Sequence, residues 1–148
     1  VNITRAEAKE YIERYFKAFE TIKEFLESIK ISAKNDGFVQ TLLGRRRYFD
    51  FKSATPMQIA MFEREAVNTV FQGSAADLVK MAMVKVRANL DENASMLLQI
   101  HDELIFEVKD EFAQEFGIAT QKTMEEIYTL NVPLKTSLNI AKNWGELK

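Results

Sequence analysis

In the first third of the chain, apolar residues recur at intervals of three and four positions, which is the spacing of one helical face. The pattern begins at a capping box formed by Thr4 and Glu7, and Asn35-Asp36-Gly37 provides a stop signal. It predicts an amphipathic helix, or a pair of helices, whose apolar face packs into the core. The apolar positions are Tyr11, Ile12, Tyr15, Phe16, Phe19, Ile22, Phe25, Leu26 and Ile29.

The next segments predict a small hairpin and then a long helical stretch. Residues 38–42 and 46–49 flank a turn that contains Gly44, as in a β-hairpin. A second capping box, Thr55 to Gln58 with proline at the first helical position, starts a helical pattern that continues to about Leu90. Gly73 lies inside this pattern and marks a kink or a break.

The last part of the chain predicts a second hairpin, a helix and a final strand. Residues 96–108 contain two apolar runs around a polar triplet, and a helical pattern follows from Asp110 to about Tyr128. Apolar and polar residues then alternate over 134–140, as in a half-buried strand. The sequence therefore predicts an α+β fold with a sheet of about three strands packed by helices.

Composition adds a few limits. The chain has 148 residues, no cysteine and a formal net charge of −2, so thiolate metal sites and disulfides are excluded. No apolar run approaches the roughly 20 residues of a membrane span. A net-acidic chain needs a local basic patch to bind nucleic acid, and the dense one is Arg45, Arg46 and Arg47 with Lys52.

The polar triplet of the second hairpin is the first candidate for chemistry. It contains His101, Asp102 and Glu103. Because a predicted buried strand lies on each side of the triplet, the two carboxylates cannot move far. Oxygen ligands on a rigid support suit a hard divalent cation. The alternative is that these side chains only solvate a turn.

The long helical pattern carries a second candidate. Arg64, Asn68 and Gln72 are spaced by four and lie on one helical face. All three can donate hydrogen bonds, so the row could read the minor-groove edge of a duplex, where every base pair presents acceptors. The alternative is a solvated polar stripe. The small residues 73–76 would permit close approach by another backbone or a ligand, although they also let helices pack.

Several motifs, in order along the chain, resemble the C-terminal part of the polymerase domain of the bacterial DNA polymerase I type, the A-family DNA polymerases. The opening residues 2–8 and the closing Asn143-Trp144 look similar too. The main matching segments are Thr41-Leu42-Leu43-Gly44-Arg45-Arg46-Arg47-Tyr48, Glu63-Arg64-Glu65-Ala66-Val67-Asn68, Gln72-Gly73-Ser74-Ala75-Ala76-Asp77 and Gln99-Ile100-His101-Asp102-Glu103-Leu104.

The resemblance implies template-directed deoxynucleotidyl transfer in DNA replication and repair, with two Mg²⁺ ions, primer–template DNA and dNTP as partners. It implies that residues 1–54 belong to the fingers and residues 55–148 to a palm-type antiparallel sheet with long helices. It implies that Asp102 and Glu103 form the catalytic, metal-binding pair. It also implies DNA contacts by His101 near the primer terminus and by Arg64, Asn68 and Gln72 in the minor groove.

The family's second metal-binding aspartate lies in a motif resembling Asp-Tyr-Ser-Gln-Ile-Glu, and neither it nor the nucleotide-binding helix has a counterpart here. We therefore expect the chain alone not to synthesise DNA, and we expect exposed apolar helix surface that favours self-association. The resemblance implies a cytoplasmic, nucleoid-associated bacterial protein. A non-catalytic module that binds duplex DNA or a protein is the main alternative, and a metal-dependent hydrolase using Asp102 and Glu103 ranks last.

Overall fold

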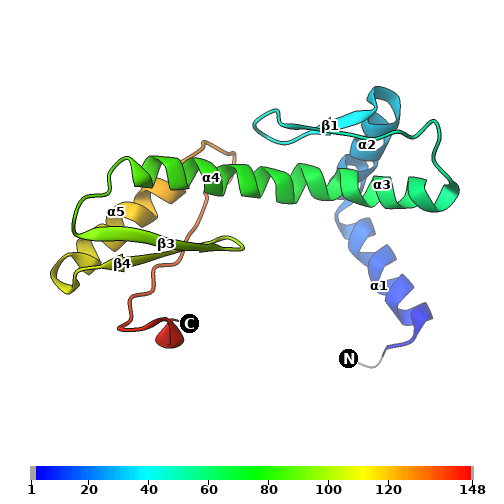
Figure 1. Ribbon diagram of the computed structural model, residues 1–148. Coiled ribbons are helices and arrows are strands. Elements are labelled where there is room, and N and C mark those ends of the chain that lie inside the picture. The colour runs from blue at the N-terminus through cyan, green and yellow to red at the C-terminus, as the bar shows by residue number, and fades with distance from the viewer. Residues whose placement is uncertain (1–2, 148) are drawn as a thin grey trace. The chain divides into compact units, whose positions relative to one another are not determined.

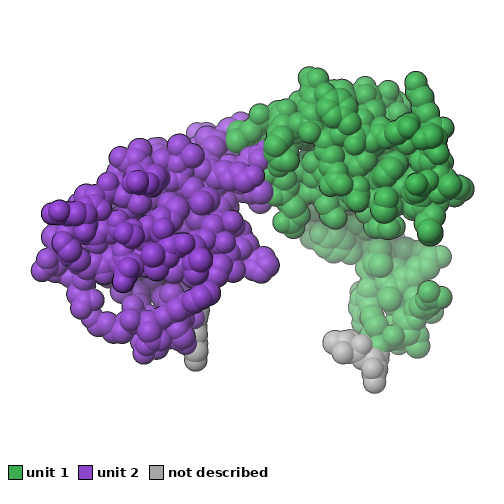
Figure 2. All heavy atoms as spheres, viewed as in Figure 1, with its two compact units in different colours: residues 1–74 green, residues 75–148 purple. Residues whose placement is uncertain are grey.

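The computed structural model describes residues 3–147 (Figure 1). The chain divides into two compact units, residues 1–74 and 75–148, which Figure 2 colours separately. Each unit combines helices with a two-stranded antiparallel sheet in its described part, which confirms the predicted α+β class. Within residues 3–147, every helix is too short or too polar to cross a membrane.

The first unit begins with two helices, α1 (Arg5–Ala18) and α2 (Glu20–Asp36), so of the predicted alternatives, one helix or a pair, the pair is formed. Thr4 forms the capping box: its backbone N–H donates to Glu7 at 2.7 Å, and its hydroxyl accepts from the Glu7 N–H at 3.3 Å. Phe19 separates the helices in a non-helical conformation, with φ −126° and ψ 61°. Gly37 ends α2 at φ 74°, a left-handed conformation that glycine adopts without strain.

The prediction that the apolar face of these helices is core is wrong for α1, which has no buried residue. The main packing partner of α1 in the described structure is α2, so most of its aromatic stripe stays exposed and the rings contact mainly one another. On α2 the face becomes buried only from Ile29 onward. The large side chains left exposed are Tyr11, Ile12, Tyr15, Phe19, Ile22 and Phe25.

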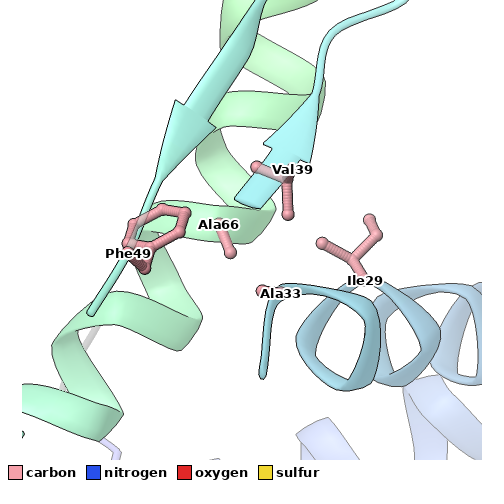
Figure 3. Close-up of a cluster of buried hydrophobic side chains, with 5 residues drawn as sticks. All are labelled: Ile29, Ala33, Val39, Phe49 and Ala66. Atoms are coloured by element: carbon pink, nitrogen blue, oxygen red, sulfur yellow. The ribbon is translucent and has the colours of Figure 1, made fainter. Parts of the chain in front are cut away.

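The core of the first unit lies between α2, the first hairpin and α3 (Pro56–Asn68). The hairpin pairs β1 (Phe38–Gln40) with β2 (Arg46–Tyr48). Figure 3 shows the buried side chains that meet there, and Phe51 and Phe62 pack around them with Phe49 at ring distances of 5.5 to 5.9 Å. The buried set is Ile29, Ala33, Val39, Phe49 and Ala66.

The predicted kink at Gly73 takes the form of a π turn, Thr69–Gly73, between α3 and α4 (Ser74–Arg87). Hydroxyl groups at its two ends bond to carbonyls four residues back. Thr69 Oγ1 donates to the Glu65 carbonyl at 2.7 Å, and Ser74 Oγ donates to the Val70 carbonyl. Side chains that take helix carbonyls in this way loosen the regular ladder and bend helices.

In the second unit, β3 (Ala94–Ile100) pairs with β4 (Glu103–Val108), and a short 3₁₀ turn leads into α5 (Ala113–Glu125). The register shifts between Met96 and Leu98, which makes Leu97 the extra residue of a β-bulge. Phe106 on β4 packs edge to face on Phe116 of α5, with ring centroids 5.2 Å apart. This contact ties the hairpin to the helix.

The predicted third strand over 134–140 is not formed in the described structure, where β3 and β4 make a two-stranded sheet. Side chains of α5 form hydrogen bonds with the backbone of the 134–140 segment instead. The Thr136 N–H donates to Glu125 Oε1 at 3.0 Å, and the Thr136 carbonyl accepts from Gln121 Nε2 at 2.7 Å. Leu138 packs on Gly117 of α5, so the segment alternates as predicted but covers a helix.

Candidate functional site

The first candidate site is the turn between β3 and β4. Ile100 pairs with Glu103, so His101 and Asp102 form a two-residue loop. His101 has φ 53°, a left-handed conformation that histidine and asparagine tolerate better than most residues. Gln99 Nε2 donates to the His101 carbonyl and supports the turn. The structure therefore brings the three predicted residues together and leaves them exposed.

The donor set of this turn suits Mg²⁺. Asp102 lies in the loop and Glu103 begins β4, so both carboxylates belong to a short hydrogen-bonded hairpin end. Proteins often hold Mg²⁺ with one or two carboxylates and the phosphates of a substrate. Within residues 3–147, no group of three or more His, Cys, Asp or Glu side chains lies close enough together to hold a metal ion by itself. The described residues can therefore supply part of a metal site, with Asp102 as the first candidate.

The second candidate site is the polar row on α3 and the π turn. Arg64 and Asn68 lie on α3, Gln72 lies in the π turn, and all three are exposed. The row therefore belongs to the first unit and the acidic turn to the second.

The arginine-rich tip of the first hairpin has partners that the sequence did not reveal. Arg46 lies over the Phe38 ring at 4.5 Å, and Arg47 forms an ion pair with Glu65 at 2.7 Å. Arg45 Nη2 donates to the Gly73 carbonyl at 3.1 Å. The tip therefore reaches the π turn, and Gly73, one of the small residues noted in the sequence, permits close approach by the side chains of Thr41 and Arg45.

A groove of about 530 Å³ lies in the second unit, away from the predicted site residues. Residues of β4, α5 and the C-terminal segment line it, and Phe106, Phe116 and Leu138 are among them. None of its lining residues belongs to the acidic turn or to the polar row. Its lining mixes apolar residues with polar ones such as Gln121, Asn139 and Lys142, and the candidate chemistry lies outside it on exposed surface.

Comparison with known proteins places the chain in a family. The profile of DNA polymerase family A matches residues 1–146. The chain belongs to this family.

The relatives are bacterial enzymes that match over the whole chain. DNA polymerase I of Helicobacter pylori (strain ATCC 700392 / 26695) is 47% identical over 151 aligned residues, which cover 100% of this chain and 17% of that protein. DNA polymerase I of Bacillus caldotenax is 43% identical over 152, again 100% of this chain and 17% of the relative. The chain thus spans about one sixth of the length of these relatives.

A solved structure agrees with the fold. The polymerase domain of Pol1 from M. smegmatis, in complex with DNA primer-template and dNTP, superposes with a TM-score of 0.89 at 36% sequence identity. The match covers 96% of this chain and 26% of the other. The resemblance found in the sequence motifs is therefore confirmed by both sequence and structure comparisons.

Proposed function

We propose that this chain forms part of the active site of a DNA-directed DNA polymerase, in which Asp102 binds catalytic Mg²⁺ with support from Glu103. The observation that carries the proposal is the tight turn: in a member of DNA polymerase family A, the hairpin presents two adjacent carboxylates to solvent, Asp102 in the two-residue loop and Glu103 at the first position of β4. Rigid presentation of oxygen ligands is what a metal site for phosphoryl transfer requires.

The residues of this chain would hold and orient the reactants. Asp102 and Glu103 supply negative charge at the hairpin end, and His101 lies beside them where a primer terminus would approach. When bound, two Mg²⁺ ions would favour deprotonation of the primer hydroxyl and neutralise charge on the leaving pyrophosphate. Arg64, Asn68 and Gln72 would donate to minor-groove acceptors that are common to all base pairs. Such contacts test the shape of a pair without reading its sequence.

The ligands follow from the same proposal. Primer–template DNA and dNTP are the partners, since the matched M. smegmatis domain is a complex with both. The two-part assignment of residues 1–54 to fingers and 55–148 to palm remains part of the proposal. Replication and repair of DNA in the bacterial cytoplasm, at the nucleoid, is the setting that this activity requires.

The direct test is removal of one carboxylate in the intact gene product, meaning the natural polypeptide that contains these residues. Asp102→Asn should lower Mg²⁺-dependent primer extension by more than about 100-fold, since even indirect supports of metal ligands are worth about 10- to 100-fold. Affinity for primer–template DNA, measured by fluorescence anisotropy, should stay within about threefold. Glu107→Gln, an exposed carboxylate on β4 outside the turn, is the matched control and should keep full activity.

Two results would contradict the proposal. Full primer extension by the Asp102→Asn enzyme would remove Asp102 from the metal site. No primer extension by the intact wild-type gene product, combined with tight duplex binding, would favour a non-catalytic DNA-binding module.

We also propose that the 148-residue polypeptide by itself does not extend primers, because its sequence contains no second aspartate motif of the kind the family uses. A primer-extension assay on the purified polypeptide, with its Asp102→Asn variant as the contamination control, tests this. Incorporation that depends on Mg²⁺ and disappears in the variant would overturn it.

The same polypeptide should self-associate through α1. Tyr11 and Ile12 are 60% and 58% exposed, and Tyr15 and Phe19 are each 50% exposed, which leaves a contiguous apolar surface that water solvates poorly. Sedimentation velocity at increasing concentration should show a reversible shift to larger species. The double variant Tyr11→Lys/Tyr15→Lys should abolish the shift, and a monomer at all concentrations in the wild type would refute the proposal.

A further inference from the structure

We propose that Arg45 is a positioning residue for the polar row: the tip of the first hairpin fixes the π turn, and the π turn keeps Arg64, Asn68 and Gln72 in line. The inference deepens the proposed function and rests on it, since it assumes that the row contacts a minor groove. The contacts that carry it lie entirely within the first unit.

Residues spaced by four move gradually around the surface of an α-helix, and the π turn reverses this rotation within the polar row. An α-helix completes a turn in about 3.6 residues, so the step from Arg64 to Asn68 overshoots one turn slightly. A π-helix bonds residues five apart and needs more than four residues per turn, so the step from Asn68 to Gln72 falls short of one. The two deviations have opposite signs. Gln72 therefore returns close to the line of Arg64, whereas an unbroken α-helix would carry it further around.

The hairpin tip holds this irregular turn at its C-terminal end. The Arg45 guanidinium donates to the Gly73 carbonyl at 3.1 Å, and the Leu42 N–H donates to Ser74 Oγ at 2.8 Å. The Ser74 hydroxyl in turn donates to the Val70 carbonyl inside the turn. A hydrogen-bonded chain thus runs from the hairpin backbone into the π turn.

The tip is rigid enough to act as a support. The Thr41 N–H donates to the Arg45 carbonyl at 2.9 Å, and the Gly44 N–H donates to the Thr41 carbonyl at 2.9 Å. The Thr41 side chain is 5% exposed and accepts from the Arg45 N–H at 3.2 Å. The backbone that carries Arg45 is therefore fixed by its own hydrogen bonds as well as by burial of Thr41.

The fit leaves no room for a side chain at position 73. A Cβ atom on Gly73 would lie 2.8 Å from Thr41 Cγ2 and 3.2 Å from Arg45 Nη2. Glycine is thus needed where the tip and the turn meet, and the contact is specific to this pair of elements.

The test measures minor-groove contact rather than total affinity. The intact gene product binds two primer–template duplexes that differ in one purine near the primer end, which is either natural or its 3-deaza analogue, without the minor-groove N3 acceptor. The wild type should prefer the natural duplex by about 3- to 10-fold, the worth of one good hydrogen bond. Gln72→Ala should abolish the preference, and Arg45→Met should reduce it to less than about half.

Two features separate positioning from other roles of Arg45. Arg45→Lys retains a donor for the Gly73 carbonyl and should recover most of the preference for the natural duplex. Affinity of Arg45→Met for the 3-deaza duplex should stay within about twofold of the wild type, because no direct DNA contact is lost. Circular dichroism should show unchanged helix content in each variant.

Several outcomes would overturn the inference. If Arg45→Met weakens both duplexes equally and lowers the salt dependence by about one released ion, Arg45 contacts a phosphate instead. If Arg45→Met leaves the preference for the natural duplex intact while Gln72→Ala abolishes that preference, the positioning role of Arg45 is refuted but the proposed minor-groove contact of Gln72 stands. If the wild type shows no preference and Gln72→Ala changes nothing, the proposed minor-groove contacts fail and this inference fails with them.

Discussion

Replacing Gly73 with alanine tests how tightly the hairpin tip and the π turn fit. The new methyl group would meet the Thr41 methyl, Cγ2, at 2.8 Å, which is closer than two carbon atoms can lie without displacement. Thr41 is 5% exposed and β-branched, so its methyl cannot rotate away easily. The tip must therefore move, and its hydrogen bonds to the turn must lengthen.

The magnitude follows from two opposing terms. Alanine is favoured over glycine inside a helix by about 1 kcal/mol. Overpacking of a filled contact costs about 1 to 3 kcal/mol. Gly73→Ala should therefore lower the free energy of unfolding by about 0 to 2 kcal/mol, although alanine alone would be expected to raise it.

The compensating change is Thr41→Ser, which deletes the obstructing methyl and keeps the hydroxyl that accepts from the Arg45 N–H. Removal of one methyl by itself should cost about 0.8 kcal/mol. In the Gly73→Ala background it should instead be neutral or stabilising, because the new methyl fills the space. A coupling of at least about 0.5 kcal/mol between the two sites is therefore expected.

Amide hydrogen exchange at Leu42 gives a local readout beside urea unfolding, because its N–H donates to Ser74 Oγ across this contact. Exchange should accelerate in Gly73→Ala and slow again in the double variant. Independent, additive effects of the two substitutions on both measurements would refute the packing argument. The packing argument would also be refuted if Thr41→Ser alone accelerated amide exchange at Leu42 as much as Gly73→Ala does.

Further predictions concern the turn, α5 and α1. His101→Val should lower the free energy of unfolding, measured in urea, by about 1 to 2 kcal/mol, because a β-branched residue is strained at positive φ. His101→Gly should not lower it, and an equal loss of unfolding free energy in the two variants would contradict this prediction. Gly117→Ala should cost about 1 kcal/mol by the same measurement, since its Cβ would lie 2.8 Å from Leu138 Cδ1; an unchanged midpoint would show that Leu138 yields freely. Hydrogen bonds from the Thr4 backbone and hydroxyl lower the pKa of Glu7 below its ordinary value. The support that ionised Glu7 gives α1 is therefore complete above its unfolded pKa and is lost as the pH falls through the folded pKa. Helix content by circular dichroism should fall over that acid range, and Glu7→Gln should flatten the change.

The elements that depend on near neighbours could be predicted from the sequence. The capping boxes at Thr4 and Thr55 form as expected, because each joins residues only three positions apart. Gly37 ends α2 for an equally local reason. The acidic turn is also local, since a two-residue loop is fixed by the strands that flank it.

The features that depend on distant contacts could not be predicted. The sequence placed a break at Gly73, but the π turn is held by Arg45, which is 28 positions away. The alternation over 134–140 looks like a strand because packing on α5 requires the same period as packing in a sheet. The aromatic stripe of α1 predicted burial, since a periodic pattern shows that a face is apolar but not what covers it.

The same division holds for the candidate site. The residue types and spacings that make Asp102, Arg64 and Gln72 candidates are visible in the sequence, and the structure places these residues on exposed surface. The support beneath the row is not visible, because the hydrogen bond from Arg45 to the Gly73 carbonyl uses a backbone acceptor that every residue has.

The bulge at Leu97 has a consequence for solubility. In the described structure, β3 and β4 pair only with each other, so each strand leaves a row of backbone groups that another chain could join. An extra residue interrupts that row in β3 and increases the local twist. Leu97 and Leu98 are both exposed, and exposed apolar side chains on a regular strand edge would favour association with another chain. The irregularity therefore makes β3 a poorer template for a strand of another chain than a regular edge would be.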